Sequence, residues 1–201
     1  MAIKVANNNS LASITALPSG VSGGAMNLIS TQTASSSSTL SFTSNIDDTY
    51  DEYVFRFYDI HPATDTAEFT FQTSTNSGSS YGVTATTTFF RAQHNEAGDA
   101  TTLGYATAFD LAQSTGFQVL SGDIGADADQ AQAGYLHLFD PSSTTFVKHF
   151  MAQVNNAHEA EYTINNFSAG YFNTTTAIDA VQFKMDSGAI ESGVIKLYGI
   201  S

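Results

Sequence analysis

Apolar and aromatic residues alternate with Ser, Thr and other polar residues along most of the chain, and this period of two limits the possible folds more than any other feature. Residues 53–60 are the clearest example, because Tyr53, Phe55 and Phe57 share one face when the segment is extended. The same signal recurs around Leu40 and Phe42 and in residues 68–72, 83–91, 135–139, 146–151, 161–164, 180–185 and 193–200. We therefore expect about eight or nine strands.

The intervals between these segments contain the Gly, Pro, Asp, Asn and Ser residues that tight turns require. Only residues 106–114 have a spacing that fits a helix, of about two turns, and residues 95–134 show little alternation. Strands that do not alternate with full-length helices argue against a parallel α/β sheet. The sequence predicts an all-β fold, an antiparallel β-sandwich of jelly-roll-like form, with residues 95–134 as a long excursion at one end.

Residues 1–38 differ in composition from the rest of the chain. They are rich in Asn, Ser, Ala and Gly and include Pro18 and a run of four Ser residues at 35–38. This composition is typical of an arm or linker, so we expect an extended N-terminal arm over 1–38 and a β-sandwich domain over 39–201. The arm's apolar residues are too scattered for an amphipathic helix, and we expect them to bury against another surface. They include Ile3, Val5, Leu11, Ile14 and Leu17.

Charge and composition exclude several classes of function. Six Lys and Arg residues stand against 19 Asp and Glu residues, a formal net charge of -13. Because nucleic-acid binding depends on neutralising phosphates, this balance argues against DNA and RNA as partners, and against anionic membrane surfaces. No apolar run reaches the roughly 18 residues of a membrane helix, and the first residues lack the apolar core of a secretion signal. The absence of Cys excludes disulfides, thiol nucleophiles and cysteine-ligated zinc.

Acidic residues offer a weak candidate for metal binding. Asp123, Asp127 and Asp129 place three carboxylates on a Gly-containing segment, and Ca²⁺ prefers several oxygen ligands on a loop. The spacing does not match an EF-hand loop, and a solvated acidic loop is the simpler interpretation. Calcium is therefore the one cofactor that we consider. The five His residues form no metal-binding motif, and no nucleophile elbow or phosphate-binding loop occurs, so we expect no catalytic residues.

Most of the aromatic residues are expected to fill the space between two sheets. A second interpretation concerns four aromatic residues near turns, whose rings would stack on sugar faces beside Asn, Asp and Gln side chains. They are Tyr81, Phe90, Tyr105 and Tyr171.

Several segments carry a resemblance to a known group of proteins. They are residues 28–44, 50–55, 60–64, 137–149 and 193–200, which include Ile60-His61-Pro62-Ala63-Thr64 and His137-Leu138-Phe139-Asp140-Pro141. Taken together, the chain from about Leu28 onward resembles small β-rich virion structural proteins of tailed bacteriophages, of the type found in marine and cyanobacterial phages. These motifs are strand and turn sequences, so the resemblance implies membership of a virion and no active site.

The resemblance and the composition favour one function. We expect a non-enzymatic virion structural protein that contacts other virion proteins and copies of itself, with a trimer favoured, anchored by its arm. A head decoration or cement role is preferred over a tail or fibre-base component. The alternative is a lectin-like module that binds host-surface carbohydrate through exposed aromatic residues and the segment 123–129. A hydrolase would require two facing carboxylates in a cleft.

Overall fold

The computed structural model describes residues 25–200, and in this range the chain forms strands and loops without a helix. The predicted all-β antiparallel sandwich is confirmed. The strands are β1 (Met26–Thr33), β2 (Leu40–Phe42), β3 (Glu52–Pro62), β4 (Ala67–Ser74), β5 (Ala85–Asn95), β6 (Thr101–Tyr105), β7 (Gln118–Ile124), β8 (Gln132–Phe139), β9 (Lys148–His158), β10 (Tyr162–Phe172), β11 (Ala180–Met185) and β12 (Ile190–Ile200).

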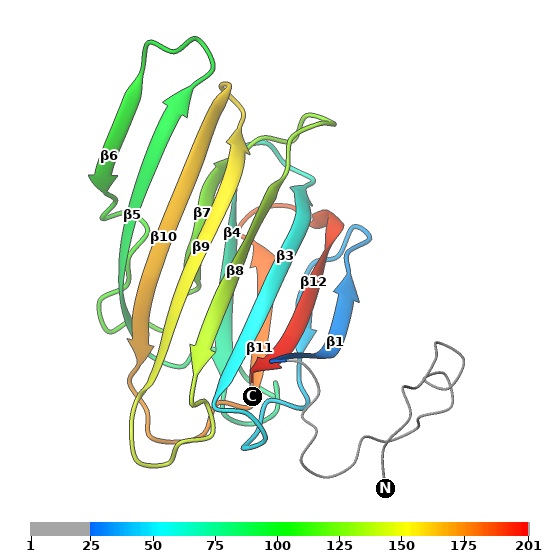
Figure 1. Ribbon diagram of the computed structural model, residues 1–201, viewed down its shortest axis with the longest axis vertical. Helices are drawn as coiled ribbons and strands as arrows, with labels where there is room; N and C mark the ends of the chain where they lie inside the picture. Colours follow the sequence, from blue (N-terminus) through cyan, green and yellow to red (C-terminus); the bar gives the residue numbers. More distant parts are fainter. Residues whose placement is uncertain (1–24, 201) are drawn as a thin grey trace, which may run out of the picture.

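The strands form two layers (Figure 1). Eight strands make the large layer, in the order β6-β5-β10-β9-β8-β3-β12-β1, and every neighbouring pair is antiparallel. The small layer, β7-β4-β11-β2, lies behind it. A single pairing of Ile124 with His158 connects β7 to β9 and so joins the layers into one continuous sheet. The large layer therefore has one side on the core and one side facing outward.

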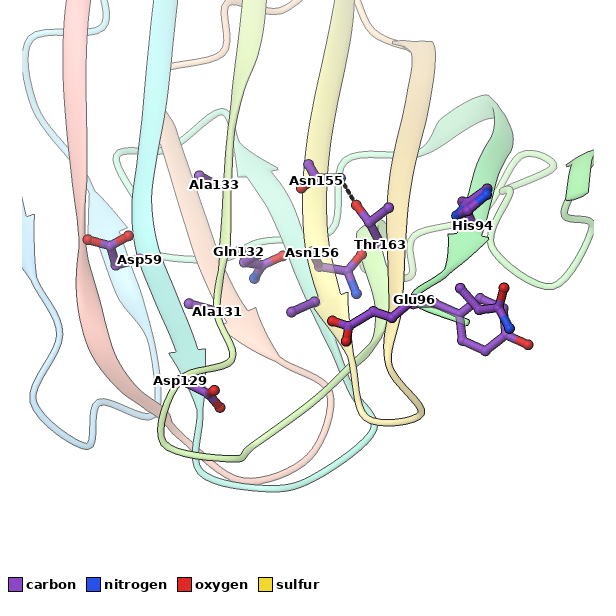
Figure 2. A pocket seen from close by; sticks show the side chains of 13 residues that line it. Asp59, His94, Glu96, Asp129, Ala131, Gln132, Ala133, Asn155, Asn156 and Thr163 are labelled. Carbon is purple, nitrogen blue, oxygen red and sulfur yellow. Dashed lines mark hydrogen bonds between the residues drawn. The ribbon is translucent and has the colours of Figure 1, made fainter. Parts of the chain in front are cut away.

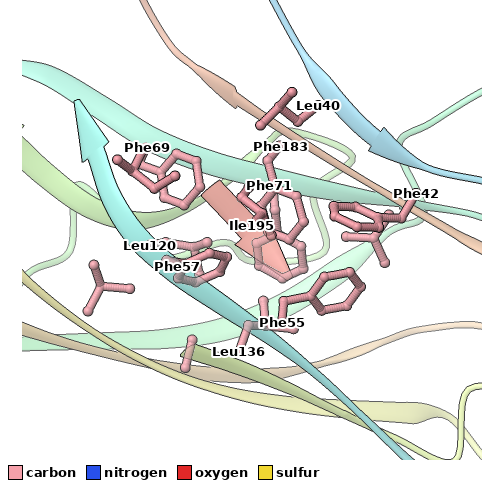
Figure 3. Close-up of a cluster of buried hydrophobic side chains, with 14 of the residues drawn as sticks. Leu40, Phe42, Phe55, Phe57, Phe69, Phe71, Leu120, Leu136, Phe183 and Ile195 are labelled. Carbon is pink, nitrogen blue, oxygen red and sulfur yellow. The ribbon is translucent and has the colours of Figure 1, made fainter. Parts of the chain in front are cut away.

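Phenylalanine side chains from both layers meet in the core (Figure 3). Phe183 of β11 lies at the centre, with five other rings at centroid distances of 5.2 to 6.2 Å. These rings belong to Phe42, Phe55, Phe57, Phe69 and Phe71. As the alternation predicts, Tyr53, Phe55 and Phe57 are all buried. Edge-to-face and stacked ring pairs add to the hydrophobic stabilisation that burial supplies.

A pair of irregularities bends β3 and β12 where they run side by side. The register of strand pairing shifts between Phe57 and Ile60 where β3 pairs with β8, and between Ser192 and Val194 where β12 pairs with β3. Asp59 and Gly193 take positive φ angles at these points, 49° and 118°. A β-bulge of this kind redirects a side chain, and here it places Asp59 at the rim of a hollow described below.

Two predictions about residues 95–134 are wrong. The segment is not one long excursion, because it contains β6 and β7. Residues 106–114 form turns instead of a helix, since their backbone bonds with β5: Ala85 and Ser114 pair, and the Leu111 carbonyl accepts from Thr87 N at 2.9 Å. Phe109 packs edge-to-face on Phe89 at 5.1 Å, which holds this segment against the inner side of β5.

The region predicted as an arm divides into two parts. Residues 26–33 form β1, which pairs with β12 along its length, and Ser37 bridges to Ile190. The free edge of β12 offers backbone donors and acceptors to this Ser- and Thr-rich segment, so the sheet begins before residue 39. The predicted assembly residues Ile3, Val5, Leu11, Ile14 and Leu17 lie outside the described residues.

Candidate functional site

The outward side of β8, β9, β10, β5 and β6 carries most of the exposed aromatic side chains of the large layer. Strand pairing sets one residue from each of these strands in a single row across the sheet: Tyr135, Gln153, Phe167, Phe90 and Tyr105. Their neighbours along each strand point the other way, as Phe89 does, which is fully buried beside the exposed Phe90.

We call the outward side chains of these five strands the aromatic face. Its members are Ala133, Tyr135, His137 and Phe139 of β8; His149, Met151, Gln153, Asn155 and Ala157 of β9; Thr163, Asn165, Phe167, Ala169 and Tyr171 of β10; Thr86, Thr88, Phe90, Ala92 and His94 of β5; and Thr101, Leu103 and Tyr105 of β6. The set contains no Lys, Arg, Asp or Glu. In a chain with a net charge of -13, such a large area without ionised carboxylates is unusual.

Large apolar side chains stand exposed on this face. Leu103 is 74% exposed, Met151 58%, Tyr105 54% and Phe90 42%. The rings of Phe90 and Phe167 stack in parallel, with centroids 4.8 Å apart and planes 8° apart. Contiguous exposed apolar surface of this kind marks interaction sites in soluble proteins.

The interior side of β10 is polar where its outward side is aromatic. Asn166 and Ser168 are buried, while Phe167 between them faces outward. The Asn166 amide nitrogen donates to the Val154 carbonyl at 3.1 Å and to Asn156 Oδ1 at 2.8 Å. Asn166 Oδ1 and Ser168 Oγ have no partner among the described residues. In this middle part of the strand the usual arrangement of apolar-in and polar-out is reversed, whereas Ile164 and Phe172 on either side of it are buried apolar residues.

A hollow of about 460 Å³ lies in the middle of the aromatic face. Its larger lining side chains are Phe90, Tyr135, His137, Phe139, Met151 and Phe167. The small side chain of Ala169, beside Met151 in the pairing, leaves room at its floor. On the β3 side the face ends at charged groups: Arg56 lies 5.5 Å from the centroid of the Tyr135 ring, and Glu52 bonds to His137 Nδ1.

A second hollow, of about 600 Å³, lies at one end of the same face and is polar (Figure 2). Asp59 and Asp129 line one side, and His94 and Glu96 line the other. Between them the Asn155 amide donates to Thr163 Oγ1 at 2.9 Å. No group of three or more His, Cys, Asp or Glu side chains in residues 25–200 is arranged to hold a metal ion.

The three predicted calcium ligands are not brought together. Asp123 lies in β7 and accepts from Arg91 Nη1 at 2.8 Å, while the Arg91 guanidinium lies 5.4 Å from the centroid of the Phe109 ring. Asp127 belongs to the turn that joins β7 to β8, where its backbone nitrogen donates to Gln130 Oε1 at 3.2 Å. Asp129 instead lines the polar hollow. The Asp123 carboxylate therefore serves an ion pair that holds β5 near β7.

The predicted sugar-contacting aromatic residues divide between two places. Phe90, Tyr105 and Tyr171 belong to the aromatic face, and the Tyr105 hydroxyl donates to Asp110 Oδ2 at 2.5 Å, which raises the pKa of Tyr105. Tyr81 lies apart from them in the β4–β5 loop, with its hydroxyl buried. Met151, Leu103 and Phe167 also belong to this face, and only strand pairing, not residue type, identifies their outward positions.

The described cations are engaged by other groups of the chain. In addition to Arg91 and Arg56, Lys184 lies 4.4 Å from the centroid of the Phe117 ring and Lys196 lies 5.3 Å from that of Tyr58. Lys148 is buried, and its Nζ donates to the Thr174 carbonyl at 3.3 Å. Burial lowers the pKa of Lys148, against an opposing effect of Asp140.

Comparisons with protein-family models, with curated proteins and with solved structures return no match. A search of the described residues for a helix long and apolar enough to cross a membrane finds none.

Proposed function

We propose that the chain is a non-enzymatic structural subunit of a tailed-bacteriophage virion, of head decoration or cement type in preference to a tail or fibre-base component. The observation that carries the proposal is the aromatic face, which exposes Leu103, Met151, Tyr105 and Phe90 without a single Lys, Arg, Asp or Glu. Depletion of charge and enrichment of aromatic residues and Met characterise the centres of protein interfaces. The resemblance of the strand and turn motifs to phage virion proteins is the reason for assigning this interface to a virion.

The architecture suits a subunit whose work is mechanical. A sandwich built from long antiparallel strands around a phenylalanine core is a rigid body, and its partners in this proposal are other virion proteins and copies of itself. The charge balance and the engaged cations support the exclusion of nucleic acid, because phosphate binding requires available Lys and Arg side chains.

The decisive experiment counts the protein in particles. Particles of the phage that encodes the chain are purified on a density gradient, and copies per particle are determined by quantitative mass spectrometry against a known capsid protein. We expect a fixed copy number that survives repeated purification. Absence of the chain from particles that contain all other structural proteins would refute the proposal.

The anchoring role of the N-terminal region is tested by a deletion that leaves the sheet intact. Removing residues 1–24 retains β1, which begins at Met26. Because Ile3, Val5, Leu11, Ile14 and Leu17 supply apolar area worth about 25 cal/mol per Å² when buried, we expect the truncated chain to fold but to be lost from particles. Particles with the normal copy number of truncated chain would show that the anchor lies elsewhere.

A lectin-like role is the second candidate, and one observation favours it. Phe90, Tyr105 and Tyr171 lie on the same side of the sheet as the polar hollow that Asp59 and Asp129 line, and the lining of that hollow includes the Tyr162 side chain. Binding of the purified chain on a glycan array, lost in Tyr105→Ala, supports this role. Silence of the array both with and without calcium excludes it.

A further inference from the structure

We infer that the aromatic face is a self-association surface, which packs against the same face of a second copy of this chain around a twofold axis. The inference rests on the proposed function of a self-assembling structural subunit and names the partner of its aromatic face. It replaces the trimer that the resemblance favours with a dimer as the unit formed in solution.

The distribution of charge on the chain favours a second copy of the chain as the partner of this face. A chain with a net charge of -13 attracts basic partners through its acidic surfaces and repels its own copies. In a twofold contact each group near the axis meets its own equivalent, so a carboxylate there would face a carboxylate. The outward positions of the five strands carry no Asp, Glu, Lys or Arg, and the nearby Asp110 and Glu52 carboxylates bond to Tyr105 and His137. This arrangement reduces the repulsion between two copies, which a distinct basic partner would not require.

The face carries both exposed apolar side chains and a hollow, which allow it to pack against itself. Along β5 and β6, Phe90, Tyr105 and Leu103 form a ridge of exposed apolar side chains. Beside it lies the hollow of about 460 Å³, bordered by Tyr135, His137 and other rings. When two copies pack face to face, the ridge of each copy meets the hollow of the other. Both features lie on one side of one sheet, so they meet a single neighbour, whereas a ring of three requires two different contact surfaces.

The area is sufficient for a stable dimer. At about 3.3 Å per residue along a strand and about 4.8 Å between strands, the five strands present a flat footprint of roughly 700 Å². Standard interfaces bury about 800 Å² per partner, and the side-chain relief adds to the flat footprint. Two sheets packed face to face with interdigitating side chains are a common arrangement in proteins.

The arrangement of β10 around Phe167 also favours an interface on the outward side of the sheet. Phe167 and Tyr171 face outward, and the interior positions on either side of Phe167 carry Asn166 and Ser168. Within a single chain the outward rings bury only part of their apolar area, as in the stacked Phe90 and Phe167 pair. In an interface the same rings would become buried anchors.

The test measures mass in solution on the full chain. Sedimentation velocity and light scattering are run from about 1 to 100 µM protein, because interfaces of this size have dissociation constants of about 1 µM or lower. The variants are Met151→Glu on the aromatic face and Leu28→Glu on β1. These side chains are similarly exposed, 58% and 57%. Met151 lies on β9 in the middle of the large layer and Leu28 on the edge strand β1, with β8, β3 and β12 between them. Each substitution removes one exposed apolar side chain and adds one negative charge.

We expect wild type at twice the 21.3 kDa mass of the chain, Met151→Glu at the single-chain mass, and Leu28→Glu as wild type. Placing like charges in the contact weakens dimerisation by about 100-fold or more. Far-UV circular dichroism confirms that both variants remain folded, and Leu103→Glu provides a second disruption on the ridge. A wild type that is monomeric or trimeric at about 100 µM, or a Met151→Glu chain that dimerises normally, overturns the inference.

This outcome is separable from that of the proposed function. A chain that is present in particles but monomeric in solution removes the inference and leaves the proposed function. A dimer that never appears in particles removes the proposed function and leaves the self-association surface.

Discussion

Replacing Phe183 with Ala tests whether the phenylalanine cluster holds the two layers together. Phe183 is fully buried, and its ring contacts Phe55 and Phe57 of the large layer as well as Phe69 and Phe71 of the small layer. Truncation of a buried Phe costs about 3–5 kcal/mol, and the cost is highest where the surroundings cannot collapse into the cavity. Five rings fixed by strands on both sides leave little room to collapse, so we expect about 4–5 kcal/mol.

The free energy of unfolding is measured by urea titration, followed by circular dichroism and by the fluorescence of the nine Tyr residues, since the chain has no Trp. For a domain of this size the expected loss lowers Tm by about 10–15 °C. Phe183→Leu, which keeps most of the volume, should cost less than about 2 kcal/mol. Phe146→Ala is the surface control, because Phe146 is 70% exposed. A loss below about 1.5 kcal/mol in Phe183→Ala, with an unchanged urea dependence, would refute the central role of this ring.

Two further substitutions test local features. Desolvation, with help from Asp186 and Asp123, raises the pKa of Glu68. The resulting destabilisation is absent below the ordinary pKa of Glu, grows as the pH rises past it, and is complete above the raised pKa. Glu68→Gln should therefore raise Tm at pH 7, and the gain should vanish at about pH 4. Glu159→Gln, at an exposed position, is the surface control. Gly193→Ala should cost about 1–3 kcal/mol, because the residue has a φ of 118° and an added Cβ would lie 2.6 Å from the Asp59 carbonyl. Gly104→Ala, where nothing lies within 4 Å of an added Cβ, is its control, and equal Tm values for the two variants would contradict the explanation.

The fold class was predictable because the period of two survives in most strands. Residues 53–57 show why: Tyr53, Phe55 and Phe57 alternate with residues of other types, and all three are buried. The missed strands lacked this signal. In β1 the segment Met26–Thr33 carries apolar residues at irregular spacing, and its partner β12 lies at the other end of the chain. The strand β1 forms because it pairs with β12, and the local sequence of residues 26–33 does not indicate this pairing.

The candidate site was harder to predict, because its members are defined by the side of the sheet that each side chain faces and not by residue type. Phe89 and Phe90 are adjacent and chemically identical, yet one is fully buried and the other 42% exposed. Phe150 and Met151 are likewise adjacent and apolar, and Phe150 is buried while Met151 is 58% exposed. A shift of one residue in strand pairing would exchange the two sides, and only the pairing of β5 with β10 and of β10 with β9 fixes which residue faces outward.

The distribution of polar and apolar residues about β10 connects the fold with the proposed assembly. Burying Asn166 and Ser168 brings atoms without partners into the interior, and exposing Phe167 leaves apolar area in contact with water. Both features lower the stability of an isolated chain. Each unsatisfied buried polar group costs about 1–3 kcal/mol, and outward apolar area gains no stabilisation from burial. Burial of the apolar cluster around Phe183 opposes this cost. Only contact with another surface recovers free energy from the outward rings, and a face without charges permits that surface to be the same face of a second chain.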